Sequence, residues 1–269
     1  MRTRTLIVAA LAVGGFACSG CFQISSVLIV KGDGSGAIEQ RLLLTSAALA
    51  QIRGLGAIGG GNGPNFDPFS EQQARAAAAS LGPGVTYVSS TPVKTPHGEG
   101  RDIRYSFTDI SQLHITEQPP ALGGISIATL GGPAEQISFK LTQEPGGNAL
   151  LRIIVPRPSL AGSDRGQRNP GGQISLDQIA MFRQMLAGAH LSIFVEPVGQ
   201  IVRTSSPYAD GTRVTLIDLD LDQLLNDQTV LSRLQAALTP EEVKAILKDI
   251  PGVTVNLDPE ITIEFAPQR

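Results

Sequence analysis

The stretch Ile103-Arg104-Tyr105-Ser106-Phe107-Thr108 decides the fold class of this chain. Apolar and polar side chains alternate along it, which is the pattern of a strand with one buried face. The same alternation recurs at 137–141, 253–257 and 261–265. These segments therefore predict half-buried strands of a mainly antiparallel sheet.

Turn sequences separate the alternating segments. They are rich in Gly, Pro, Asp and Asn, which favour tight connections between neighbouring strands. They lie at 32–36, 96–100, 144–148 and 258–259. Hairpins are therefore expected as the repeating local unit.

Three segments carry the start and stop signals of helices. Ser70 and Gln73 form a capping-box pattern before an Ala-rich run that stops at Gly82. Similar signals bound 175–188 and 239–252. The patterns together predict an α+β fold in which about four to six helices pack on the sheet.

The apolar faces of the strands are expected to lie against those helices. Strands 103–107 and 261–265 would meet helices such as 175–188, whose Phe182 and Leu186 share a face.

Two further segments read as surface loops. Residues 54–68 are rich in Gly, Asn and Pro, and 157–172 mix Pro, Gly, Ser and Arg. The second divides the chain after the export signal roughly in half, so it is a candidate boundary between two lobes.

The N-terminus has the pattern of an export signal. Arg2 and Arg4 precede an uncharged apolar run at 6–17, and small residues at 19–20 directly precede Cys21. The run of 12 residues is too short to span a bilayer.

This segment resembles the signal of bacterial lipoproteins, in which the cysteine after a small pair is acylated with chains such as palmitate. The resemblance implies removal of residues 1–20 and a lipid-anchored α+β envelope domain at 21–269, on the outer membrane or cell surface, with Cys21 as the lipidation site. Cys18 stands where the lipoprotein pattern prefers Leu. Cleavage after Ser19, which would release a soluble secreted protein, is the alternative.

The start of the processed chain also resembles that of uncharacterised, LppM-type envelope lipoproteins of actinobacteria. Cys21 is followed by a strand pattern, Asp33-Gly34-Ser35-Gly36 and a second strand pattern. The resemblance implies an α+β envelope domain of unknown biochemistry, and no functional residue beyond Cys21 carries over from it.

Composition narrows the classes of partner. Without the signal the chain has 19 basic and 24 acidic residues, a net charge of −5, which argues against nucleic acid as a partner. The one cysteine that remains excludes an internal disulfide. With no Trp and three Tyr, the chain is poor in the aromatic rings on which sugars stack.

A literal G-x-G-x-x-G motif occurs at 54–59. In a dinucleotide-binding protein this motif follows a strand and opens a helix. Here a helix-like segment at 46–53 precedes it and a Gly-rich tract follows. The motif is therefore interpreted as a flexible loop, and no nucleotide cofactor is predicted.

Three acidic residues, Asp218, Asp220 and Asp222, alternate with leucines and would offer oxygen ligands to calcium. An EF-hand loop needs Gly and Glu where this chain has Gln223 and Thr229. The preferred interpretation is a solvated strand face whose last member, Asp222, caps the following helix.

The histidines His97, His114 and His190 are too scattered to predict a zinc site. A G-x-S-x-G nucleophile elbow is also absent from the sequence. A Ser-His-Asp triad could still assemble in space, because its members need not be close in sequence. No metal, cofactor or catalytic residue is predicted.

Two functional hypotheses follow. The leading one is a lipid-anchored, non-catalytic envelope protein that binds a protein partner, a wall component or an apolar ligand. The alternative is a lipid-anchored hydrolase whose site is not visible in the sequence. A closed apolar cavity would favour an apolar ligand, and a convergent Ser/His/Asp cluster would favour chemistry.

Overall fold

The computed structural model describes seven stretches of the chain: 22–46, 48–49, 69–96, 98–116, 136–155, 188–237 and 239–268. Cys21, the glycine motif at 54–59, the loop at 157–172 and nearly all of the segment expected to form a helix at 175–188 lie outside them.

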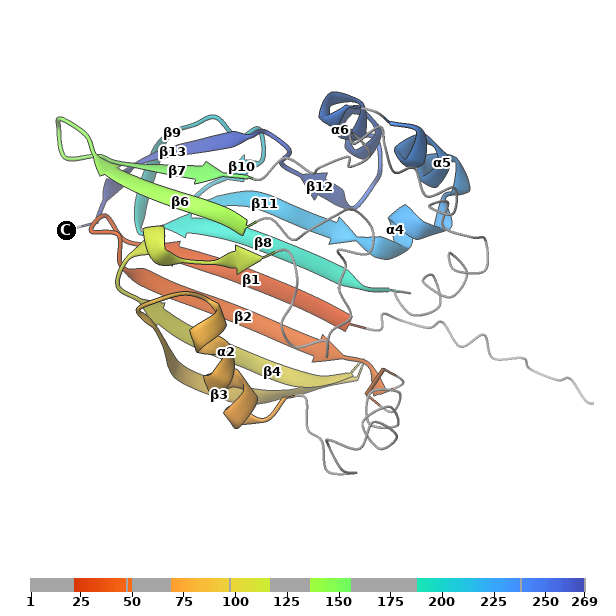
Figure 1. Ribbon diagram of the computed structural model, residues 1–269, viewed down its shortest axis with the longest axis horizontal. Coiled ribbons are helices and arrows are strands. Elements are labelled where there is room, and N and C mark those ends of the chain that lie inside the picture. The colour runs from red at the N-terminus through yellow and green to blue at the C-terminus, as the bar shows by residue number, and fades with distance from the viewer. Residues whose placement is uncertain are drawn as a thin grey trace, which may run out of the picture.

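The larger of two sheets has eight strands (Figure 1). Its order is β10-β11-β8-β1-β2-β4-β3, and β12 also pairs with β11. The strands are β1 (Phe22–Val30), β2 (Gly36–Leu44), β3 (Val85–Thr95), β4 (Gly98–Phe107), β8 (His190–Pro197), β10 (Ala209–Asp210), β11 (Arg213–Asp220) and β12 (Val253–Val255).

The smaller sheet has five strands in the order β5-β6-β7-β13-β9. They are β5 (Ile115–Thr116), β6 (Gln136–Gln143), β7 (Ala149–Ile154), β9 (Gly199–Thr204) and β13 (Glu260–Pro267). The described helices are α2 (Glu71–Ser80), α4 (Leu221–Asn226), α5 (Gln228–Ala236), α6 (Pro240–Lys248) and the short 3₁₀ helix η1 (Ile110–Gln112).

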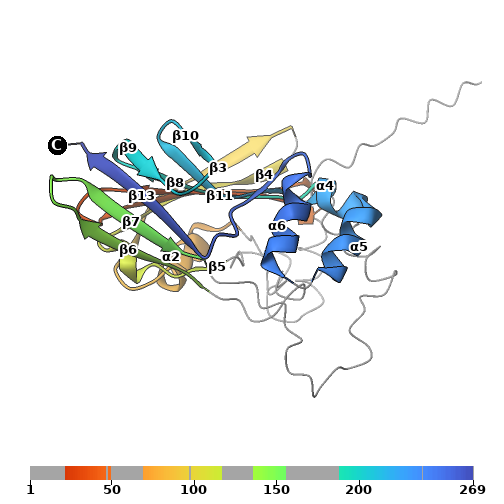
Figure 2. The same cartoon turned by 90° about the horizontal axis from the view of Figure 1, so that it is seen from above.

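The two sheets share one apolar core. Leu28 and Val195 of the larger sheet and Leu151 and Ile263 of the smaller one are all 0% exposed and belong to one cluster. Seen from above, β6 and β7 lie on the same side of the larger sheet as α2, while α4, α5 and α6 gather at one end (Figure 2). The inward faces of both sheets are therefore buried mainly against each other.

A tight turn joins β1 to β2 and fixes their register. Gly34 has a φ of 87°, which favours glycine, and Asp33 Oδ1 accepts hydrogen bonds from the backbone N (3.0 Å) and Oγ (2.7 Å) of Ser35. The bonds from Ser35 lower the pKa of Asp33. At Gly36 a side chain would collide with the carbonyl oxygen of Ile29, 2.0 Å from an ideal Cβ position.

Both halves of the chain contribute to both sheets. β8 pairs with β1 in parallel, with His190 opposite Gln23. The last strand, β13, lies between β7 and β9 in the smaller sheet. The larger sheet is therefore mixed, although its other strand pairs are antiparallel.

The alternating segments form the strands that the sequence predicts. The segments at 137–141 and 261–265 fall on β6 and β13, and 103–107 fall on β4. The strand expected at 253–257 is shorter, because β12 ends at Val255 and Asn256 beyond it is buried. The turns at 32–36, 96–100 and 144–148 join paired strands. The turn at 258–259 does not form a hairpin, because β12 pairs with β11 while β13 pairs with β7 and β9.

Among the described residues only three helices, α2, α5 and α6, reach nine or ten residues, fewer than the four to six that were expected. Helix α4 has only six residues. Ser70 and Thr239 cap α2 and α6, as the sequence predicts. Because a second sheet packs on the larger one and shares its core, a layer of several helices on the sheet is not what the described residues show.

Helix α2 does pack on the inner face of the larger sheet. The Tyr105 hydroxyl donates a hydrogen bond to the carbonyl oxygen of Ala74, at 3.0 Å. Tyr105 is 0% exposed, and its burial raises its pKa to about 12. The expected burial of Ile103, Tyr105 and Phe107 is confirmed, and of these Tyr105 contacts α2. The helix expected at 175–188 to cover them lies almost wholly outside the described residues.

Candidate functional site

The proposed lipidation site adjoins the centre of the larger sheet. Cys21 lies outside the described residues, but the next residue, Phe22, is the first of β1. Consecutive Cα atoms are about 3.8 Å apart, so whatever holds Cys21 also holds the start of β1. This end of the sheet includes His190, because Gln23 and His190 are opposite each other in the β1–β8 pair.

The three histidines do not come together. His97 lies outside the described residues, and the backbone N of His114 donates to the carbonyl oxygen of Leu81 at 2.8 Å. His190 begins β8, where its Nε2 lies 2.6 Å from Oδ1 of Asp218. Both side chains of this pair are about 40% exposed, at 41% and 40%.

The three aspartates occupy different environments. Asp218 pairs with His190, and Asp220 accepts a 3.4 Å hydrogen bond from the backbone N of Gln223 at the start of α4. Asp222 lies within α4 rather than on the strand. The prediction that Asp222 caps this helix is therefore wrong, because the strand ends two residues earlier, at Asp220, and Asp220 is the acceptor. The described residues contain no group of three or more side chains suited to a metal ion.

A catalytic triad does not assemble around His190 among the described residues. Ser192 is the nearest serine along β8 and is 4% exposed, opposite Asp218 in the strand register. The hydrogen bond of His190 is to Asp218, and none joins it to a serine hydroxyl in this part of the chain. The pair has the acid and the base of a triad without its nucleophile.

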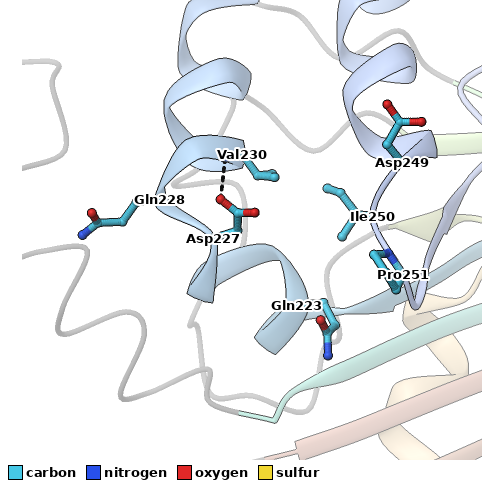
Figure 3. Close-up of a pocket in the computed structure, with 7 residues that line it drawn as sticks. All are labelled: Gln223, Asp227, Gln228, Val230, Asp249, Ile250 and Pro251. Carbon is cyan, nitrogen blue, oxygen red and sulfur yellow. Dashed lines mark hydrogen bonds between the residues drawn. The ribbon is translucent and has the colours of Figure 1, made fainter.

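An open cleft lies in the corner formed by α4, α5 and α6 (Figure 3). We call this region the helical corner; it spans residues 221–250. The cleft has a volume of about 560 Å³. It is lined by Gln223, Asp227, Gln228, Val230, Asp249, Ile250 and Pro251.

The helix ends position the polar groups of the cleft. Asp227 caps α5 by accepting hydrogen bonds from the backbone N atoms of Thr229 (2.8 Å) and Val230 (3.0 Å). Asp249 lies at the C-terminal end of α6 and is exposed. Val230 and Ile250 belong to a small apolar cluster of their own. The lining of the cleft therefore combines carboxylates and side-chain amides with apolar groups.

The helical corner and the strand end before it carry most of the net charge. Residues 218–249 contain seven acidic and three basic side chains, a net charge of −4. The processed chain has a net charge of −5. Such a surface attracts cationic groups and repels anionic ones, within a Debye length of about 8 Å in physiological salt.

Sequence reasoning missed both the cleft and the His190–Asp218 pair. The start signal of α6 was visible at Thr239, and that of α5 could have been found at Asp227. Nothing in a single sequence places the end of α6 beside the start of α5. The pairing of strands β8 and β11 brings His190 next to Asp218, and this too is not encoded locally.

The described residues thus define a β-rich domain of two packed sheets with a small acidic helical corner. No helix among them is both long and apolar enough to cross a membrane. No protein-family model matches the chain, and neither does any curated protein.

Among solved structures, the chain is similar to the folded domain of LppM from Mycobacterium tuberculosis, determined by NMR. The TM-score is 0.32 and the sequence identity 9%, with 93% of each chain covered. At that TM-score the likeness carries no argument about fold or function.

Proposed function

We propose that the protein is an exported lipoprotein, anchored through acyl chains on Cys21, whose folded domain binds a protein partner without catalysis. The observation that carries the proposal is the position of Cys21, which ends an export signal and directly precedes β1 at the centre of the larger sheet. Two or more acyl chains at this point would hold the domain at the membrane stably.

The cleft supports a protein partner over an apolar ligand. It is open and lined by two carboxylates and two side-chain amides as well as apolar groups. An apolar ligand is better served by an enclosed, mostly apolar pocket. The net negative charge of residues 218–249 fits a partner that presents basic side chains.

The anchor is tested by cell fractionation of two cysteine variants. Cys21→Ser should release the protein from membranes, while the matched control Cys18→Ser should leave it bound. Intact-mass analysis of the native protein should show acylated Cys21 as its first residue. Retention of the Cys21→Ser protein in the membrane fraction, with a processed N-terminus at Gly20, would contradict the proposal.

The partner surface is tested by site-specific photocrosslinking in cells. A crosslinker at Gln228, in the cleft, should give an adduct of defined mass. The yield of this adduct should fall when salt is added and when Asp249 is replaced by Asn. The same crosslinker at exposed Lys140, on β6, is the matched control. Identical adducts from both positions would show that the helical corner is not the contact surface.

A lipid-anchored hydrolase is the second candidate, favoured by one observation. The 2.6 Å contact of His190 with Asp218 resembles the base and acid of a triad. If this pair is catalytic, ester hydrolysis by the purified protein should fall at least about a hundredfold in His190→Gln. Activity that is unchanged in this variant would remove the candidate.

A further inference from the structure

Arg101 has an unusual environment beneath α2. It lies on β4, two residues before Ile103 and four before Tyr105. Because alternate residues of a strand share a face, its side chain leaves the sheet on the same inner face as these two buried side chains. Its Nη1 donates a 2.6 Å hydrogen bond to Oγ of Ser90. Its Nε is buried and has no hydrogen-bond partner, which sets it apart from the other buried side-chain nitrogens and oxygens that the structure describes.

Two other arginines show how this chain uses the same edge of the guanidinium group. Arg41 donates from Nε (2.7 Å) and Nη2 (2.8 Å) to the carboxylate of Asp102. Arg75 donates from Nε (3.0 Å) and Nη2 (2.5 Å) to Glu71. Within the described residues, no carboxylate forms an ion pair with Arg101. Its edge has the geometry for an oxyanion without holding one.

The neighbours of Arg101 supply further donors and a positive field. Oγ of Ser90 lies 2.7 Å from Oη of Tyr87, and the Arg75 guanidinium lies 4.3 Å above the Tyr87 ring. The pKa of Glu71 is lowered chiefly by Arg75. Tyr87 and Arg101 lower it by smaller amounts. Arg75, Arg101 and Glu71 together leave one positive charge uncompensated.

The residues of this group are partly open to solvent. Arg101, Ser90 and Tyr87 are each partly exposed, but Nε itself is covered, so an anion would reach it only when the atoms that cover it move aside. A charged N–H that is buried without a partner is costly, and such groups in folded proteins are paired with a protein group, water or an ion.

We propose that Arg101, with Ser90 and Tyr87, forms a binding site for a phosphate oxyanion, supplied either as a free phosphate compound or as a lipid headgroup. Arg101 would donate to two phosphate oxygens through Nε and Nη2, while the hydroxyl of Ser90 holds Nη1 in place. This site is separate from the cleft of the helical corner.

The position of the site makes a headgroup one of the two sources. Arg101 is opposite Leu42 in the β2–β4 pair, and Leu42 is opposite Ile24, three residues after Cys21. Two strand spacings amount to about 10 Å, so the site lies near the anchored end of the sheet. The headgroup source rests on the proposed anchoring at Cys21, whereas the free-phosphate source does not.

The first test is a phosphate titration of the full-length chain in a nonionic detergent, with chloride at matched ionic strength as reference. Inorganic phosphate should raise the thermal midpoint saturably, by roughly 3 to 6 °C at ten times its dissociation constant. The rise should vanish in Arg101→Gln and persist in Arg104→Gln, on the opposite face of the same strand. The absence of a saturable rise, or an equal rise in Arg101→Gln, would overturn the proposal.

A second variant keeps the test decisive if Arg101→Gln does not fold. Ser90→Ala retains the guanidinium group, removes the hydroxyl that holds it, and should weaken phosphate binding at least tenfold. Unchanged affinity in this variant would overturn the assigned geometry.

Vesicle flotation then separates the two sources. The Cys21→Ser protein should float with phosphatidylglycerol vesicles through Arg101 if the oxyanion is a headgroup, and remain below them if it is a free phosphate. The titration does not depend on the anchor, so a failure of the anchoring proposal would show in fractionation and leave the phosphate result standing.

Discussion

The two-sheet core and the helical corner differ in how large their apolar clusters are and in how completely these are buried. Leu28, Ile153 and Phe265 in the core are 0% exposed, whereas Val230, Ile246 and Ile250 in the corner keep 7% to 8% of their surface. The core joins residues of two sheets, while the cluster of the corner is small and separate. The sheets should therefore contribute most of the free energy of unfolding. Charged side chains and an open cleft in the helical corner then cost the whole protein little stability.

The largest effect is expected in the core. Phe265→Ala and Phe107→Ala remove rings from positions that are 0% and 3% exposed, so each should cost about 3 to 5 kcal/mol of unfolding free energy. Arg104→Ala, at a side chain 52% exposed, should cost less than about 1 kcal/mol. Urea titration measures all three.

Glu264 is not a suitable surface control for Phe265. It accepts hydrogen bonds from Asn148 and Arg203, and its side chain is 18% exposed. Equal losses in Phe265→Ala and Arg104→Ala would show that the core does not dominate stability.

The ionisation of Tyr105 gives the next largest effect, and it follows pH. Its folded pKa of about 12 lies above the ordinary value of 10.0, so the unfolded chain loses this proton first as pH rises. The contribution of Tyr105 should be complete below pH 10 and fall by about 1.4 kcal/mol per pH unit between 10 and 12. Urea titrations at several pH values in this range give the unfolding free energy as a function of pH. That free energy should fall less steeply with pH in Tyr105→Phe, and an equally steep fall would contradict burial of the hydroxyl.

A smaller loss is expected in the helical corner. Ile246→Ala opens space in the small cluster and should cost about 2 kcal/mol, near the low end for such truncations, because neighbouring helices can settle into the gap. Hydrogen exchange should also be faster in α5 and α6 than in β1 and β8. If the amide hydrogens of α5 and α6 exchange as slowly as those of β1 and β8, the helical corner is not less stable than the core.

The smallest predicted effect concerns the cap of α6. The Thr239 hydroxyl accepts a hydrogen bond from the backbone N of Glu242 at 3.2 Å, and the Glu242 carboxylate accepts one from the backbone N of Thr239. Thr239→Ala should cost about 1 kcal/mol, and Thr239→Ser, which keeps the hydroxyl, should cost a few tenths. Calorimetric midpoints compare the two, and a Thr239→Ser loss as large as that of Thr239→Ala would rule out the capping explanation.

The sequence by itself determined the local elements of this protein. Alternation at 103–108 and 261–265 predicted strands, and it named the side chains that are buried: Ile103, Tyr105 and Phe107 are at most 6% exposed. The caps at Ser70 and Thr239 were equally legible. Each of these signals acts over a few residues, within which backbone geometry and hydrogen bonding are set by near neighbours.

Only the tertiary structure decided what covers those buried faces. An apolar stripe is driven out of water with no preference of direction, so it is buried equally well by a helix or by another sheet. The sequence favoured helices, and the chain instead folds β7 and β13 over the larger sheet. The parallel pairing of β1 with β8, the His190–Asp218 pair and the unpartnered Nε of Arg101 arise in the same way. They depend on contacts between segments distant in sequence, which a local pattern does not encode.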